Sequence, residues 1–523
     1  MNLNDIKEIL NRTPELKTKI FARGFLLTDA DIDENSYPFY GLWNNNPVQD
    51  FTLMVSPEQT CYVEMLDGET LAMVGHAYNP YTMESDEKSI LKNLLRKQNE
   101  KEFFEYFNEL TGIFTCFVFK RDGGLEILGD PTCMQTTFYC RHNGHIYVSS
   151  HTNMLGALLN LEWDPYIKKL TQYKLFKLFG KTLPGDLTQF SEVKRLVPNY
   201  VYEMSEEGCK TRRFYWPHTV TLTCSEIEQQ VAQVLSNNMK LIVKKWDKPS
   251  ISLTGGCDSK TTLACAKDCY NQFSYFSYIS SEAESVDADA AHSICDALGL
   301  QHEIHHISDT DGDYSHIEEI RAILYWNAGS LLPINKNDVR KRAFYYETNK
   351  VSVEIKSWVS EIGRAYYSKR FNGRTNFGET PTPRKCTTLY KVFLNDRKLV
   401  KDTDRVFADY LSNYFERASQ NPVPWQEQFF WEFRVSSWNS LIITGEHKFS
   451  FDIVVPYNNR KLLELLLSAP MEARINDSIY TSVRKRMNPS IDNTGIAVTN
   501  LKHTKNREKM ENIYYMLHTH VPF

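Results

Sequence analysis

The residues best suited to chemistry lie in one stretch, Ile251 to Ala264, which reads ISLTGGCDSKTTLA. A short apolar run precedes two glycines, and a helix-forming run follows them. Adjacent glycines allow a tight turn that leaves backbone N–H groups free at a helix start, and such a start favours phosphate. The hydroxyls of Thr254 and Ser259 add donors, and Asp258 can reach a magnesium ion carried by that phosphate. The pattern predicts nucleotide phosphate binding, although the spacing fits neither Gly-x-x-x-x-Gly-Lys-Ser/Thr nor Gly-x-Gly-x-x-Gly.

Length and composition set outer limits on what carries this loop. A chain of 523 residues is too long for one core, so about two to four domains are expected. The net charge of −5 and the pI near 6.3 argue against broad nucleic-acid binding. None of the eleven cysteines forms a CxxC pair, which argues against zinc and favours reduced thiols in the cytosol. No signal peptide and no run of about 20 apolar residues is found, so we expect a cytoplasmic protein that does not cross a membrane.

The first third of the chain is predicted to be mostly β-structure. From Phe21 to about Asn160, short runs rich in β-branched and aromatic residues alternate with turn signals such as Arg121 to Gly124 and His142 to Gly144. Asp86 to Leu110 has helical spacing instead. We therefore expect an α+β domain built around antiparallel sheet.

The order of elements in this region resembles a known family. GIFTCFVFKRDGGLEILGDPTCMQTTFYCRHNGHIYVSSHTNMLGALL resembles the end of the glutaminase domain of asparagine synthetases, which implies an N-terminal-nucleophile (Ntn-type) fold. That family hydrolyses glutamine with a cysteine that becomes N-terminal when Met1 is removed. Here position 2 is Asn2 and the nearest cysteine is Cys61, and an asparagine cannot supply the thiolate. The resemblance then implies a degenerate glutaminase-like domain, as in β-lactam synthetase, that serves as a scaffold.

A turn-rich connection, Leu170 to Trp216, leads to the second half. Thr223 to Lys245 reads as one helix, with Ser225 and Glu228 as a capping-box pair. The domain boundary is therefore expected near 210–225, which divides the chain into 1–215 and 216–523.

Strand and helix signals alternate after this boundary. Strands are expected at 248–253, 273–280 and 302–307, with helices at 260–269 and 288–298 between them. This alternation predicts a parallel, doubly wound α/β sheet, in which ligands bind at the carboxyl ends of the strands. Residues 375–450 read as helical, which gives this domain a helical C-terminal part.

TGGCDS resembles the Ser-Gly-Gly-x-Asp-Ser loop of ATP-pyrophosphatases, with Thr254 in place of the first serine. DADAAHSICDALGLQH, from Asp287 to His302, matches the segment that follows in asparagine-synthetase-like enzymes. The resemblance implies that ATP binds here, with Mg²⁺ on Asp258. The nucleotide site that it implies comprises Leu253, Thr254, Gly255, Gly256, Cys257, Asp258 and Ser259, with Tyr278 and Ile279 beside the adenine. The alternative is a tight strand-to-helix turn with a helix cap.

A second acidic segment, KSWVSEIGRAYY at 356–367, follows the strand-like VSVEI. Its resemblance to the family is loose. It puts Glu361 where the family has a metal-binding Asp, and it adds Ser357 to the nucleotide site. Glu361 can bind magnesium through one oxygen, and Arg364 can face a phosphate bidentately. The alternative is a surface helix start with a Glu-to-Arg pair.

The chain departs from the family further on. The family has a lysine that stabilises the pyrophosphate, and Ile479 and Tyr480 occupy its place here. Arg484 and Lys485 are among the nearest cations and are the candidates to replace it. The alternative is a basic, solvated helix face.

These expectations favour an ATP-dependent ligase that adenylates a carboxylate and transfers it to ammonia or an amine. The implied partners are a small carboxylate and an amine, with no nucleic acid and no membrane; the oligomeric state, a homodimer included, stays open. Because both the cysteine and the lysine are missing, the alternative is a nucleotide-binding pseudoenzyme or assembly partner. RNA modification by such a loop is disfavoured by the mild acidity.

Overall fold

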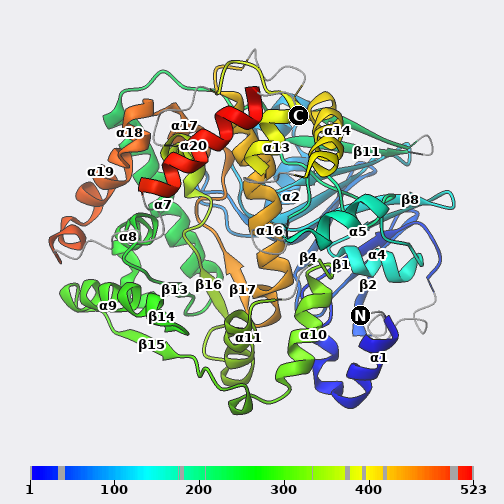
Figure 1. The fold of residues 1–523 in the computed structure, drawn as a ribbon, viewed down its shortest axis with the longest axis horizontal. Helices are drawn as coiled ribbons and strands as arrows, with labels where there is room; N and C mark the ends of the chain where they lie inside the picture. The colour runs from blue at the N-terminus through cyan, green and yellow to red at the C-terminus, as the bar shows by residue number, and fades with distance from the viewer. Residues whose placement is uncertain are drawn as a thin grey trace.

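A computed structural model gives the fold (Figure 1). The structure describes residues 3–32, 42–174, 176, 182–205, 208–331, 334–371, 377–390, 396–415, 421–494 and 505–520. Asn2, on which the glutaminase argument turns, lies outside this part. Among the described helices, none combines the length and the apolar character needed to cross a bilayer.

Two antiparallel sheets form the first part of the described chain. Sheet A has the order β10-β8-β9-β1-β3-β2, and sheet B the order β12-β11-β7-β6-β5-β4. The strands of sheet A are β1 Phe25–Thr28, β2 Asn44–Val48, β3 Phe51–Val55, β8 Phe138–His142, β9 His145–Ser149 and β10 Lys194–Arg195. Those of sheet B are β4 Cys61–Leu66, β5 Glu69–Tyr78, β6 Thr111–Phe119, β7 Leu125–Gly129, β11 Tyr200–Ser205 and β12 Gly208–Arg213.

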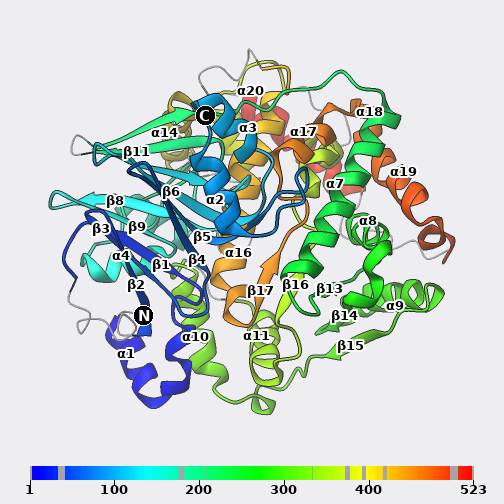
Figure 2. The same cartoon turned by 180° about the vertical axis from the view of Figure 1, so that it is seen from behind.

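The two sheets pack face to face because successive side chains of a strand point to opposite faces. On β5, Ala72 and Val74 join the core between the sheets, whereas Leu71 and Met73 join the core under α2 Glu87–Leu95 and α3 Glu100–Phe107. Phe25 of sheet A meets Phe117 of sheet B with ring centroids 5.7 Å apart. Figure 2 shows α2 and α3 over the outer face of sheet B.

Helices also cover the outer face of sheet A. Leu26 and Met54 pack with Ile6 of α1 Leu3–Arg12, Met154 of α4 Thr152–Leu158 and Ile320 of α10 Ile317–Asn327. The result is a sandwich of two sheets between two helical layers, which is the Ntn-type α+β architecture expected for this region. α5 Pro165–Gln172 follows α4 along the chain.

A five-stranded parallel sheet forms the second part of the described chain. Its order is β15-β14-β13-β16-β17, and every neighbouring pair is parallel. The strands are β13 Ser250–Ser252, β14 Ser274–Ile279, β15 His302–His306, β16 Val353–Ile355 and β17 Asp452–Val454. The strand order reverses between β13 and β16, which is the topological switch point where ligands bind in sheets of this kind. The predicted doubly wound parallel sheet is confirmed.

Helices surround this sheet and fill the remainder of the chain (Figure 1). They are α7 Cys224–Lys245, α8 Cys257–Cys265, α9 Glu282–Ala297, α11 Lys336–Thr348, α12 Tyr366–Arg370, α13 Pro383–Tyr390, α14 Arg397–Tyr414, α15 Trp425–Phe429, α16 Ser436–Gly445, α17 Arg460–Ser468, α18 Met471–Ile475, α19 Ser478–Met487 and α20 Lys505–His520. A π-helical segment, Phe430–Val435, joins α15 to α16. The expected helical C-terminal part is present, although 375–376, 391–395 and 416–420 of it lie outside the described residues.

Two local predictions were wrong in detail. The capping box of α7 is formed by Thr223 and Glu226 rather than by Ser225 and Glu228. The Thr223 hydroxyl accepts the Glu226 N–H at 3.3 Å, and the Glu226 carboxylate accepts the Thr223 N–H at 2.8 Å. The single helix expected over 86–110 is two helices, because the Asn99 side chain caps a new helix by accepting the Glu102 N–H at 3.0 Å.

Candidate functional site

A cavity of about 360 Å³ lies at the switch point of the parallel sheet. Its walls come from the end of β13 and the loop into α8, from β14, from the segment after β16, from the first turns of α9, and from the turn before β17. The lining residues are Ser252, Leu253, Thr254, Gly256, Asp258, Ser259, Ser277, Tyr278, Glu284, Asp287, Ala288, Lys356, Ser357, Trp358, Glu361 and His447. The tertiary fold thus brings together the two segments singled out in the sequence, around Asp258 and around Glu361.

The glycine loop presents the N-terminus of α8 to this cavity. Gly256 is the N-cap of α8, with φ −68°, and its lack of a side chain leaves the helix start without a side-chain cap. A Cβ at Gly256 would meet the Thr254 hydroxyl at 3.1 Å, so the glycine keeps the approach to the helix start open. Two N–H groups of the loop before α8 are engaged within the loop. The Thr254 N–H donates to Ser259 Oγ at 3.0 Å and the Gly256 N–H donates to Thr254 Oγ1 at 3.2 Å.

Asp258 and Glu361 both line the cavity, and the charge of Asp258 acts on the carboxyl group of Glu361. Burial raises the pKa of Asp258, in spite of Arg364, and burial together with the Asp258 charge raises the pKa of Glu361 to about 7. Asp258 Oδ1 is buried and accepts no hydrogen bond. Each carboxylate disfavours the ionisation of the other, and one of them has an oxygen without a hydrogen-bond partner, so a cation would stabilise the pair.

Arg364 does not present its guanidinium fork to the cavity, contrary to the expectation that it faces phosphate. Its Nε and Nη2 donate to the two carboxylate oxygens of Asp477 at 2.9 and 2.8 Å, and its Nη1 donates to Asp258 Oδ2 at 2.6 Å. Lys369 also contacts Asp477. Arg364 therefore fixes the orientation of Asp258 from behind and leaves Oδ1 of that carboxylate free.

Arg484 and Lys485, the candidates for the missing lysine, do not line the cavity. Arg484 Nη1 donates to Cys257 Sγ at 3.2 Å and to Thr261 Oγ1 at 3.1 Å, and its Nε donates to Asp492 at 3.0 Å. Lys485 is exposed on α19. Arg484 braces α8 from the side away from the cavity, and a catalytic role for either residue stays a prediction.

The remaining predicted residues divide between the cavity and its support. Leu253, Thr254, Ser259, Tyr278 and Ser357 line the cavity, and the Ser357 hydroxyl bonds that of Thr262 on α8 at 2.7 Å. Gly255, Cys257 and Ile279 do not line it. Burial raises the pKa of the Cys257 thiol, which is thus held neutral beside Arg484.

Lys356, Glu354 and His447 form a charged group on the wall opposite Asp258, and this group was not predicted from the sequence. Lys356 Nζ lies 2.7 Å from Glu354 Oε1 and 5.0 Å from the centroid of the Trp358 ring. His447 Nδ1 lies 3.5 Å from Glu354 Oε2. Burial would raise the pKa of Glu354, but Lys356 and His447 hold it well below its usual range, and burial lowers the pKa of His447 to about 3. Lys356 is therefore the cation that this cavity offers.

Of the lining residues that were not predicted, only some could have been recognised from the sequence. Lys356 follows the strand-like VSVEI directly, and the residue after a parallel strand belongs to the ligand edge of the sheet. Asp287 lay inside the DADAAHS segment already compared with the family. His447 and Glu284 carried none, since His447 comes from a turn more than eighty residues after Glu361, and Glu284 is held by Lys341 at 2.7 Å.

The donor set fits Mg²⁺, a cation that proteins bind through one or two carboxylates together with substrate phosphates. The orphaned Asp258 Oδ1 and the raised pKa values of Asp258 and Glu361 are the observations that fit it. No cluster of three or more His, Cys, Asp or Glu side chains able to hold a metal ion occurs in the described part of the chain. Any metal here would thus complete its ligands from a substrate or from water.

No protein-family model matches the chain, and no curated protein matches it. Solved structures that resemble it include glutamine phosphoribosylpyrophosphate amidotransferase from B. subtilis complexed with ADP and GMP. That likeness has 9% identity and a TM-score of 0.24, and it covers 69% of this chain and 74% of the other. An allosteric regulatory enzyme of purine biosynthesis has 7% identity and a TM-score of 0.26, with 60% and 84% covered. Glutamine-dependent NAD⁺ synthetase from Acinetobacter baumannii, in complex with adenosine diphosphate, has 14% identity and a TM-score of 0.19, with 63% and 75% covered. At these scores the likeness carries no argument about function.

Proposed function

We propose that the protein is an ATP-dependent carbon–nitrogen ligase that adenylates a carboxylate and passes the acyl group to ammonia or an amine. The observation that carries the proposal is the pairing of an open helix N-terminus at Gly256 with two carboxyl groups, Asp258 and Glu361, across one cavity. A helix N-terminus favours phosphate, and two carboxylates beside it favour the magnesium ion that accompanies ATP. The resemblance of TGGCDS to the ATP-pyrophosphatase loop points the same way.

The proposed reaction has two steps. A carboxylate oxygen of the acid attacks the α-phosphorus of ATP, the bond from that phosphorus to the bridging oxygen breaks, and pyrophosphate leaves. An amine nitrogen then attacks the acyl carbon, the bond to AMP breaks, and the nitrogen loses a proton to give the amide. Mg²⁺ held by Asp258 and Glu361 would neutralise charge on the pyrophosphate.

The residues of this chain have defined tasks in that scheme. The first N–H groups of α8 bind the pyrophosphate oxygens, where charge builds as the bond breaks. Arg364, itself anchored on Asp477, holds Asp258 in place through its Nη1, and Arg484 holds α8. Lys356, with its ammonium set against Glu354 and Trp358, is placed to attract the anionic acid or its acyl adenylate. The substrate acid itself stays open among small amino acids, β-amino acids and uronic acids.

We propose that the nitrogen comes from free ammonia or an amine and not from glutamine. Among the described cysteines of the antiparallel part, Cys61, Cys116 and Cys140 each have a thiol pKa raised to about 12 by burial. Burial also raises the pKa of the Cys133 thiol. None of these four thiols is a thiolate at neutral pH, and glutamine hydrolysis by cysteine needs one.

A second candidate function is nucleotide binding without turnover, as a pseudoenzyme or assembly partner. It is favoured by the engagement of Arg364 and Arg484, whose guanidinium groups already contact Asp477 and Asp492. Only Lys356 would then meet the phosphates from the opposite wall, and it is itself paired with Glu354.

Pyrophosphate release tests the two candidates directly. The protein is incubated with ATP, MgCl₂ and pairwise combinations of acids and amines, ammonium included, and pyrophosphate is measured together with ATP affinity. Release that depends on one acid supports the ligase, and Asp258→Asn should lower it by about 100-fold or more, since charge stabilisation of this kind is worth that much. Asp289→Asn, an exposed position on α9, is the matched control and should leave release unchanged. Tight ATP binding without pyrophosphate under every pairing would exclude the ligase and leave the second candidate.

A further inference from the structure

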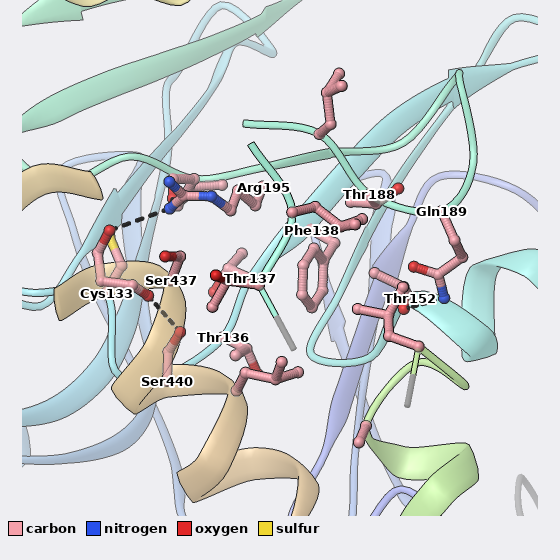
Figure 3. Close-up of a pocket in the computed structure, with 18 residues that line it drawn as sticks. Cys133, Thr136, Thr137, Phe138, Thr152, Thr188, Gln189, Arg195, Ser437 and Ser440 are labelled. Atoms are coloured by element: carbon pink, nitrogen blue, oxygen red, sulfur yellow. Dashed lines mark hydrogen bonds between the residues drawn. The ribbon is translucent and has the colours of Figure 1, made fainter. Parts of the chain in front are cut away.

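A second cavity, of about 60 Å³, lies between sheet A and α16. Figure 3 shows it between Thr136, Thr137 and Phe138 at the start of β8, Thr152 at the start of α4, Thr188 and Gln189 in the loop before β10, and Ser437 and Ser440 on α16. It shares no lining residue with the cavity at the switch point. The two cavities are therefore separate sites.

Arg195 is the charged residue of this second cavity, and its side chain is buried, with 9% exposed. Its Nε donates to Gly185 O at 3.0 Å, and its Nη1 donates to Ser436 Oγ at 3.1 Å and to Leu196 O at 3.3 Å. Its Nη2 is buried and has no hydrogen-bond partner. Figure 3 shows the guanidinium beside Ser437 on the cavity wall.

No carboxylate neutralises this guanidinium within the part of the chain that the structure describes. All of its hydrogen-bond acceptors are uncharged: two backbone carbonyls and one serine hydroxyl. The lining includes no Asp, Glu, Lys or His, and burial raises the pKa of the Cys133 thiol, which stays neutral. The cavity thus carries one uncompensated positive charge, and a buried charge without a partner is costly.

The other lining groups indicate what would compensate it. Five hydroxyl groups line the cavity, and each already donates to an oxygen within the chain: those of Thr136, Thr137, Thr188, Ser437 and Ser440. Arg195 Nη2 is therefore a donor that remains for a carboxylate oxygen. The wall is otherwise apolar, with Phe138, Leu183, Leu187, Leu331 and Leu441. One positive charge matches the single negative charge of a carboxylate, whereas phosphate carries more charge at neutral pH than this lining balances.

We propose that this second cavity binds a small monocarboxylate, whose carboxyl group pairs with Arg195 and whose aliphatic part lies against the leucines. Arginine is the side chain best matched to a carboxylate, and its unpartnered Nη2 is the donor that the ligand would use. The site joins the antiparallel part of the chain to α16, so an occupied site would tie the two together. This inference does not depend on the proposed ligase activity.

Two measurements on the full chain test the proposal: the melting temperature in the presence of each acid, and the binding of each acid by calorimetric titration. The probes are sodium acetate, butyrate and hexanoate, with n-butanol as the uncharged analogue of butyrate and inorganic phosphate as the competing anion. At least one of the three acids is expected to bind saturably and raise the melting temperature, while butanol and phosphate are not. Arg195→Gln should weaken that binding by at least about 30-fold, as expected when one partner of a buried charge pair is lost.

Two further variants keep the test decisive if Arg195→Gln is itself unstable. Ser437→Leu fills the cavity and keeps the arginine, so acid binding should be lost although the charge remains. Arg342→Gln removes another buried guanidinium with an unpaired Nη1, outside this cavity, and should leave the acid effect intact. Binding of phosphate in place of every acid, equal binding of butanol and butyrate, absence of any acid effect, or an acid effect that survives in Ser437→Leu would each overturn the proposal.

Discussion

At the scale of single residues, most charged side chains around the candidate site are already paired within the chain. Arg364 and Arg484 are bound to carboxylates of the same chain, while Asp258 retains one free oxygen and Glu361 is held against its charge. The site therefore has unsatisfied negative charge on one wall and Lys356 on the other. This arrangement suits a metal–phosphate group bound between the two walls, because the metal would lie against the carboxyl groups and the phosphate against Lys356.

The raised pKa of Glu361 predicts a specific pH dependence of stability. Its pKa is about 7 in the folded protein against an ordinary 4.5, so the folded state holds the proton more tightly than the unfolded state. This contribution to stability is complete below about pH 4.5 and is lost as the pH rises through about 7. Glu361→Gln, which stays neutral, should gain unfolding free energy relative to the natural protein between these pH values.

Urea unfolding at pH 4.5, 6 and 8 without magnesium measures this difference. The gain of Glu361→Gln over the natural protein should be larger at pH 8 than at pH 4.5. Glu472→Gln, at an exposed position of α18, should show no such trend. A difference for Glu361→Gln that does not change with pH would contradict the assignment.

At the scale of elements, helix ends decide what the site can do. α8 begins with a glycine N-cap, which leaves its N–H groups to a ligand, and α7 begins with a complete capping box. α7 packs against α17 and α19, and α19 carries Arg484, which braces α8. A well-capped helix thus supports the one whose N-terminus is left open.

The corrected cap of α7 makes a prediction about stability. Thr223→Ala removes the side chain that accepts the Glu226 N–H and should lower the unfolding free energy by about 1 kcal/mol. Ser225→Ala, at the position first read as the cap from the sequence, should change it by less than about 0.5 kcal/mol. Urea unfolding of the two variants side by side distinguishes the two readings, and a larger loss for Ser225→Ala would reverse the assignment.

At the scale of the whole molecule, buried charges join the antiparallel part to the helical C-terminal part. Arg213 of β12 donates to both carboxylate oxygens of Glu432, on the π-helical segment, at 2.6 and 2.8 Å. Asn199 donates to the same carboxylate at 2.8 Å, and Glu432 has 0% of its side chain exposed. Trp431, next to it, donates its indole N–H to Pro131 O at 2.7 Å. The antiparallel part and the helical C-terminal part are therefore fixed to each other through this segment.

Removal of one partner of this pair should be strongly destabilising. Glu432→Gln leaves the Arg213 guanidinium buried without a counter-charge, which costs about 3–5 kcal/mol of unfolding free energy. Asp402→Asn breaks the pair with Arg405, whose side chain is 78% exposed, and should cost less than about 1 kcal/mol. Denaturant unfolding of both variants checks the contrast, and a loss below about 1 kcal/mol for Glu432→Gln would mean that the pair does not hold the two parts together.

The sequence by itself determined the class of each part, the alternation of strands and helices, and the glycine loop at a strand end. These features follow from local spacing: a period of two for strands, helical spacing after each turn, and glycine beside a helix start. The same local signals placed Asp258 after a strand, whereas Glu361 was indicated by the resemblance to the family, and the parallel sheet brings both segments to one edge. They were less reliable where two signals compete over a few residues, as with Ser225 and Thr223 at the start of α7.

Only the tertiary structure decided which charges are free. Arg364 finds Asp477, 113 residues later, and Arg484 finds Asp492 and α8, so neither faces the cavity although both read as phosphate ligands. Lys356 and His447 meet at Glu354 because β16 and β17 are neighbours in the sheet. Arg195 is left without a counter-charge because of what packs around it, and no spacing in the sequence encodes that. Long-range packing decides which charged side chains pair with each other. The chemistry of the site follows from the charged groups that remain without a partner.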